Sequence, residues 1–108
     1  MYPGTYRYFD RLRSPLAERR SSAIPKEPFY AIYGIGPYTS SPYKVCWSEV
    51  ANEINAAVIG TYKCDYIGEK VAAPDHTVVT ISFDNETEAH YVCGLLNSSS
   101  VRLVIKGY

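Results

Sequence analysis

The chain has few residues of the kinds that usually build a catalytic or metal site. Its 108 residues include two histidines and three cysteines. Cys46, Cys64 and Cys93 match no zinc-binding spacing, and three cysteines cannot all pair within one chain. We therefore expect free, reduced thiols in a cytoplasmic protein. A phosphate-binding glycine loop is also missing, because neither Gly34 nor Gly36 precedes a predicted helix.

The chain also lacks net charge and long apolar runs. Its formal net charge is zero and its pI is about 6.7, which excludes a strong non-specific DNA binder that works by neutralising phosphates. The charge is uneven, since residues 1–27 carry six basic and three acidic side chains, a pattern usual for a solvated helix face. No stretch approaches the ~20 apolar residues of a membrane span, and no signal peptide is visible, so we expect no membrane partner.

Tyrosine is abundant, with 11 residues against three phenylalanines and one tryptophan. A tyrosine ring can stack while its hydroxyl stays hydrated, so an excess suits both the edge of a core and a binding surface. The length fits one domain, which we expect to cover residues 1–108.

The N-terminal third is predicted to hold two short helices, a linker and a strand. Apolar side chains recur at helical spacing up to Leu16, and Pro15 interrupts them, which predicts helices over 5–13 and 15–21 with Ser14 as the second N-cap. Prolines make residues 21–28 a linker. The apolar and aromatic run 29–35 predicts a strand.

The remainder predicts further strands followed by two helices. Alternation or β-branched content predicts strands at 43–48, 56–64 and 77–83, the last of them near the sheet centre, with a helical turn in 49–55 and a loop over 65–75. Asn85 and Glu88 form a capping box, so a helix should follow and end near 97–100. A last helix should be capped by Ser99 or Ser100. The predicted class is α+β, with a mainly antiparallel sheet of about four strands and helices at both ends.

A stiff polar loop over 36–47 is the main candidate for a binding surface. Pro37 and Pro42 restrict its backbone, and hydroxyl groups lie between them. Alternation in the strand that follows puts Lys44 on the face opposite Val45. Such side chains can contact phosphates and base edges. The DNA-contact candidates are Tyr38, Thr39, Ser40, Ser41, Tyr43, Lys44 and His76.

Two other groups of residues are candidate sites. His90 lies three residues before Cys93 on the predicted helix, so a cysteine–histidine nucleophile pair is conceivable, but Cys93 falls on the buried stripe, where cysteine behaves as a small hydrophobe. Asp75 precedes the strand at 77–83 and is expected to bond its own backbone in a turn. We predict no catalytic, cofactor-binding or metal-binding residue in this segment.

Five stretches of the chain form an ordered set of motifs: 29–39, 42–47, 74–77, 88–91 and 95–99. Together they resemble the C-terminal target-recognition part of adenine-specific DNA methyltransferases of fused type IIG restriction–modification enzymes. Residues 95–98 are also similar to specificity subunits of type I systems. The resemblance spans about residues 6–108.

The resemblance implies double-stranded DNA as partner and a methyltransferase domain upstream in the parent chain, with SAM as the cofactor of that parent. No Asn-Pro-Pro-Tyr element is present to hold a flipped adenine, so this segment is expected to recognise DNA without catalysing. Ser40 and Ser41 depart from the family pattern, which more usually has an aromatic and a small residue there. The alternative function is a structural packing or partner-binding module within the same enzyme.

Overall fold

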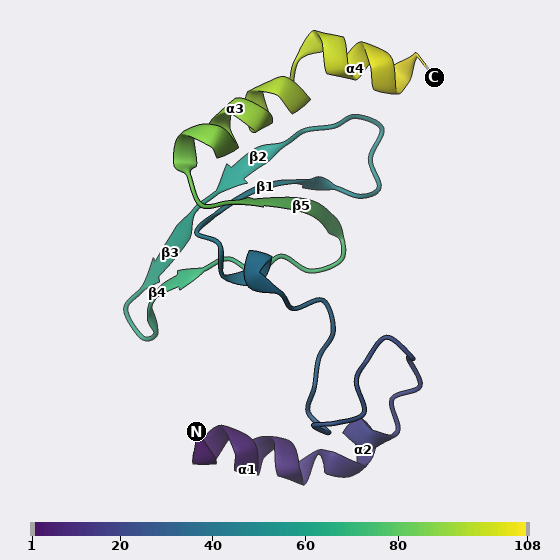
Figure 1. Cartoon of the computed structure of the whole chain (residues 1–108), viewed down its shortest axis with the longest axis vertical. Coiled ribbons are helices and arrows are strands. Elements are labelled where there is room, and N and C mark those ends of the chain that lie inside the picture. Colours follow the sequence, from purple (N-terminus) through teal and green to yellow (C-terminus); the bar gives the residue numbers. More distant parts are fainter. Residues whose placement is uncertain (1, 108) are drawn as a thin grey trace. The chain divides into compact units, whose positions relative to one another are not determined.

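The computed structural model describes residues 2–107 and divides into two compact units, one ending at Ile35 and one beginning at Gly36. Each unit is described by itself. Helices lie at both ends of the chain, and the strands form one antiparallel sheet of three and another of two (Figure 1). The predicted α+β class is therefore confirmed, while the single domain over 1–108 stays a prediction. No helix within residues 2–107 is both long and apolar enough to cross a bilayer.

Two short helices begin the first unit, as predicted, but with different bounds. Helix α1 spans Pro3–Arg11 and α2 spans Arg13–Ala17. Leu12 is the N-cap of α2, so the expected cap at Ser14 is wrong. Pro15 explains the break, because a proline has no N–H and its ring clashes with the carbonyl four residues earlier, here that of Arg11.

Aromatic side chains hold the first unit together. Tyr6 meets Phe29 edge to face at a centroid distance of 6.1 Å, and Phe9 stacks on Tyr30 at 6.2 Å. The Arg13 guanidinium lies 3.8 Å from the centre of the Phe29 ring. Phe29 is the buried apolar residue of this unit. The apolar stripe of α1 therefore packs against the aromatic residues that follow the linker.

The strand predicted over 29–35 is wrong, and this segment forms turns and bends. The Arg19 guanidinium donates to the carbonyls of Phe29, at 2.7 Å, and Ala31, at 2.8 Å, which removes acceptors that a strand partner would need. Gly34 has φ of 73°, outside the extended region. Hydrogen bonds from a distant arginine therefore override the local β propensity.

Strands β1 (Tyr43–Ser48), β2 (Ala57–Ile59) and β5 (Val78–Phe83) form the three-stranded sheet in the order β2-β1-β5. The central strand is β1, whereas β5 lies at an edge, so the predicted central position of 77–83 is wrong. Val45 pairs with Val58 on one side and Ile81 on the other. Because directly opposed side chains share a face, these three lie together.

The strand predicted over 56–64 is two strands, which separate at Gly60 and join different sheets. Strand β3 (Thr61–Cys64) pairs with β4 (Gly68–Val71), so the loop predicted over 65–75 is wrong for residues 68–71, while 65–67 and 72–75 are turn and irregular structure as predicted. Gly68 has φ of 71°, which a glycine adopts without strain at the start of β4. Residues 2–107 therefore contain five strands in two sheets, where the sequence predicts one sheet of about four strands.

Helix α3 (Glu86–Leu96) begins at the predicted cap and packs on the three-stranded sheet. The Asn85 carbonyl Oδ1 accepts from the backbone N–H groups of Thr87 and Glu88, at 2.8 and 3.2 Å. Ala89 on the helix and Val45 on β1 are both fully buried, and they mark the core of this unit. Figure 1 shows α3 on one side of the sheet and the short helix before β1 on the other.

Helix α4 (Ser99–Lys106) follows α3, and its N-cap is Ser98 rather than Ser99 or Ser100. The helix contacts the connection between β1 and β2, where residues 49–55 form bends and not the predicted helical turn. Arg102 donates to the Asn55 side chain at 3.1 Å, and Lys106 forms an ion pair with Glu53. Val50, near the start of this connection, is 90% exposed.

Candidate functional site

The polar loop before β1 contains one turn of 3-10 helix, η1 (Pro37–Ser40), where the sequence predicts only a stiff loop. The turn closes on itself, because the Thr39 N–H donates to the Gly36 carbonyl at 2.9 Å and the Gly36 N–H donates to the Thr39 hydroxyl at 3.1 Å. The Ser40 hydroxyl donates to the Pro37 carbonyl at 2.9 Å. Prolines and hydroxyl groups together give the loop a defined conformation.

Tyr38 is the aromatic residue that this loop presents to solvent, with 52% of its surface exposed. Its ring lies against Gly36, where an added Cβ would come within 2.5 Å of Cε1. Its carbonyl accepts a hydrogen bond from the Ser82 hydroxyl on β5, at 3.0 Å. The backbone of Tyr38 is thus tied to the sheet while its side chain stays accessible.

Lys44 lies beneath the loop and is 2% exposed. Its ammonium group donates to the carbonyls of Ser41, at 2.7 Å, and Thr39, at 3.2 Å. None of the ion pairs formed by residues 2–107 includes it. The alternation of β1 places Lys44 opposite Val45 as predicted. The two hydrogen bonds from Lys44 to loop carbonyls hold the loop in place. Its burial keeps the ammonium away from solvent.

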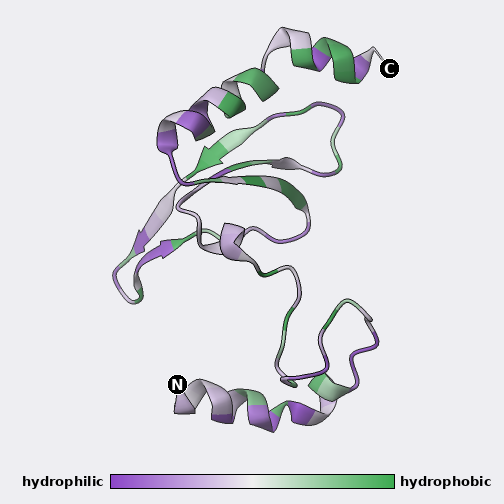
Figure 2. Cartoon of the chain, in the orientation of Figure 1, coloured by the Kyte–Doolittle hydropathy of each residue, from purple (hydrophilic) through white to green (hydrophobic). Residues whose placement is uncertain are grey.

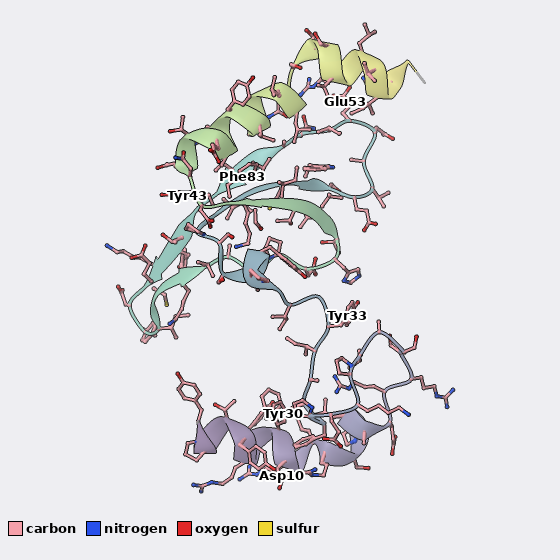
Figure 3. All side chains as sticks on the ribbon, viewed as in Figure 1. Asp10, Tyr30, Tyr33, Tyr43, Glu53 and Phe83 are labelled. Atoms are coloured by element: carbon pink, nitrogen blue, oxygen red, sulfur yellow. The ribbon has the colours of Figure 1, made fainter. Side chains whose placement is uncertain are left out.

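The other sequence-predicted contact residues differ in exposure and position. Ser40 is exposed at the end of η1, and Ser41 is half-buried. Tyr43 is half-buried and pairs across β1 and β5 with Phe83, and Figure 3 shows the two side by side near the start of α3. His76 is exposed in the turn that precedes β5. The structure therefore gathers residues 38–44 in one place. His76 is not among them, because it precedes Val78, and Ser82, which holds the loop, lies toward the other end of β5.

Ser82, whose hydroxyl holds the loop, is not among the residues predicted from the sequence. Ser82 pairs directly with Lys44 and so shares its face of the sheet. A polar serine beside a polar lysine on one face of a mostly apolar sheet indicates that something polar covers that face. Here the cover is the backbone of η1.

Cys93, His90 and Asp75 each have a structural partner. The Cys93 thiol donates to the Ala56 carbonyl at 3.3 Å, while His90 Nε2 lies 3.8 Å from a carboxylate oxygen of Glu86 on the exposed side of α3. Asp75 accepts from the N–H and the hydroxyl of Thr77, at 2.8 and 2.6 Å, which confirms the expected turn. These two hydrogen bonds lower the pKa of the Asp75 carboxyl below its ordinary value.

The described glycines do not form a loop of the kind that holds a nucleotide-type cofactor. Such a loop joins a strand to an α-helix, so that backbone N–H groups meet the ligand. Gly34 lies in a bend, and Gly36 leads into a turn of only four residues. Gly34 and Gly36 therefore do not form a phosphate-binding loop of this kind.

One curated protein gives a significant match to the chain. It is the type II methyltransferase M.NspV of Nostoc sp., with 32% identity over 100 residues. The match covers 93% of this chain and 20% of the methyltransferase, so the chain spans about a fifth of that protein's length. No protein-family model and no solved structure matches the chain. The chain is thus related to a region of a type II methyltransferase.

Proposed function

We propose that the chain is a DNA target-recognition segment of a restriction–modification adenine-N6 methyltransferase and does not catalyse by itself. The observation that carries the proposal is the similarity to a type II methyltransferase over nearly the whole chain. Double-stranded DNA is then the partner. In this proposal, the catalytic and SAM-binding parts belong to the rest of that enzyme.

The loop of residues 36–44 is the proposed DNA contact. Tyr38 offers an exposed ring and hydroxyl, and Ser40 offers a hydroxyl at the same turn. Side chains of these types contact phosphates and base edges. Lys44 and Ser82 bind the inner side of the loop, so we assign them the role of holding Tyr38 in place. A pre-formed loop loses less conformational entropy when it binds than a flexible one.

The proposal can be tested by mapping N6-methyladenine in a bacterial host without adenine methylation of its own, after expression of the complete gene that encodes the segment. We expect methylation at one recognition sequence. Tyr38→Ala should lower the methylation or extend it to other sequences. Tyr91→Ala, which removes an exposed tyrosine on α3, should do neither. A gene product that methylates no adenine would refute the proposed enzyme, and equal behaviour of the two variants would refute the loop assignment.

A second candidate function is a packing or partner-binding module within the same enzyme. Helix α4 favours it, since three consecutive apolar residues, Leu103, Val104 and Ile105, are 72%, 60% and 48% exposed. Figure 2 shows this hydrophobic segment near the C-terminal end of the chain. Sedimentation of the chain distinguishes the two functions. Self-association that Leu103→Asp abolishes, without salt-sensitive DNA binding, would favour the packing module.

A further inference from the structure

Strands β3 and β4 form a two-stranded ribbon, defined here as residues 61–71, that has little packing on either face. Every residue of β4 is exposed, as are three of the four residues of β3. Figure 1 shows the ribbon projecting beyond the three-stranded sheet, and Figure 2 shows mainly hydrophilic residues on both arms. A two-stranded hairpin without a packed face is only marginally stable in water. Because both faces of the ribbon are exposed, both are accessible to a binding partner.

The register of the ribbon separates its side chains into two faces. Tyr62 pairs with Lys70, and Lys63 pairs with Glu69. Since directly opposed side chains share a face and successive ones alternate, Tyr62 and Lys70 lie on one face and Lys63 and Glu69 on the other. We call these the tyrosine face and the glutamate face.

The two faces differ in charge. On the glutamate face, the carboxylate of Glu69 accepts from the Thr61 hydroxyl at 2.6 Å and stands opposite Lys63, so opposite charges offset each other. On the tyrosine face, Lys70 stands opposite Tyr62, which is 68% exposed, and takes part in none of the ion pairs among residues 2–107. This face therefore offers an uncompensated cation beside an accessible aromatic ring.

We propose that the ribbon is a second DNA-contacting element, which enters the major groove of duplex DNA with its tyrosine face on the sugar–phosphate backbone. The inference rests on the proposed DNA-binding function. The major groove admits a two-stranded ribbon, and lysine and tyrosine are among the side chains that contact phosphate and sugar. Tyr66, 96% exposed at the turn of the ribbon, is carried toward the base edges in this arrangement.

The test is the binding of the chain to a mixed-sequence fluorescent duplex, measured by anisotropy between about 50 and 200 mM salt. Lys70→Ala should reduce the slope of log K against log salt by about 1, and Tyr62→Ala should weaken binding by about tenfold. Lys63→Ala, the matched lysine on the glutamate face, should change neither quantity. Tyr62→Phe, which keeps the ring, should retain most of the affinity. Fluorescence of Trp47, the single tryptophan, confirms that each variant is folded.

Each outcome decides between the two proposals. A wild-type chain that binds no duplex overturns the ribbon inference, while the methylation test of the complete gene decides the proposed function separately. If the chain binds and Tyr38→Ala weakens binding while Lys70→Ala and Tyr62→Ala do not, the ribbon inference is wrong and the loop assignment stands. Equal effects of Lys63→Ala and Lys70→Ala would overturn the assignment of the faces. Ribbon variants that change self-association alone would show a polypeptide partner instead.

Discussion

Replacement of Lys44 by methionine separates two roles for this lysine. Methionine keeps the apolar stem in the buried site and removes the ammonium that donates to Ser41 and Thr39. A loop-holding lysine should stabilise the fold and leave the salt dependence of DNA binding unchanged, because it is 2% exposed. A lysine that contacts phosphate should instead contribute little to stability, and its replacement should lower the salt dependence of DNA binding.

The expected loss follows from the two hydrogen bonds. A bond to a charged donor contributes about 1.5–3 kcal/mol, but relief of the buried charge offsets part of this. The bond to Ser41 is short, at 2.7 Å, and that to Thr39 is longer, at 3.2 Å. Both acceptor residues are half-buried, so water can reach them once the lysine is gone. We expect a net loss of about 2 kcal/mol in the free energy of unfolding.

Urea unfolding followed by Trp47 fluorescence measures this loss, since Trp47 lies on the same central strand as Lys44. Ser82→Ala removes one neutral bond to the loop and should cost about 1 kcal/mol. Lys63→Met makes the same substitution at an exposed lysine and should stay within about 0.5 kcal/mol of wild type. Unchanged stability in Lys44→Met, with a salt slope of DNA binding lower by about 1, would refute the loop-holding role.

Three further predictions concern the frame around the loop. Asn97→Ala removes bonds to both the N–H and the carbonyl of Ala56, at 2.9 and 2.8 Å, and should cost about 2 kcal/mol in urea unfolding, with Asn97→Asp recovering part of it. Asn85→Ala removes the cap of α3 and should cost about 1 kcal/mol, whereas an unchanged midpoint would contradict the capping role. The hydrogen bond from Lys106 lowers the pKa of Glu53 below its ordinary value of 4.5, so its stabilisation is present above that pH and is lost as pH falls through the folded-state value. The difference in Tm between wild type and Glu53→Gln should therefore shrink below pH 4.5, and a constant difference would contradict the ion pair.

The start of α3 and the strands β1 and β5 were predictable from local sequence. Asn85 caps through its own side chain, and the alternation along β1 fixes which face Lys44 occupies whatever the rest of the chain does. The position of β5 in the sheet was not predictable in this way. Its four β-branched residues indicate a strand, but an edge differs from a centre only through pairing with other segments.

The largest errors arise where distant residues decide local structure. Residues 29–31 have strand composition, yet Arg19 occupies their carbonyls. Strand β4 reads Gly-Glu-Lys-Val and buries no face, so it gives no apolar alternation to detect. The candidate loop was found from its prolines and hydroxyls, but the burial of Lys44 was not foreseen, because an unpaired lysine is rarely buried.

The connection between β1 and β2 can vary in length among related chains. The Glu49 N–H donates to the Thr77 carbonyl at 3.1 Å, and Glu53 and Asn55 are bound to α4, so both ends of residues 50–52 are fastened. Figure 3 shows Glu53 beside that helix. Lengthening a surface loop between fixed ends costs little free energy, because closure entropy grows slowly with length. Related chains can therefore accept insertions at Val50, and a fluorescent label can be attached there without disturbing the sheet.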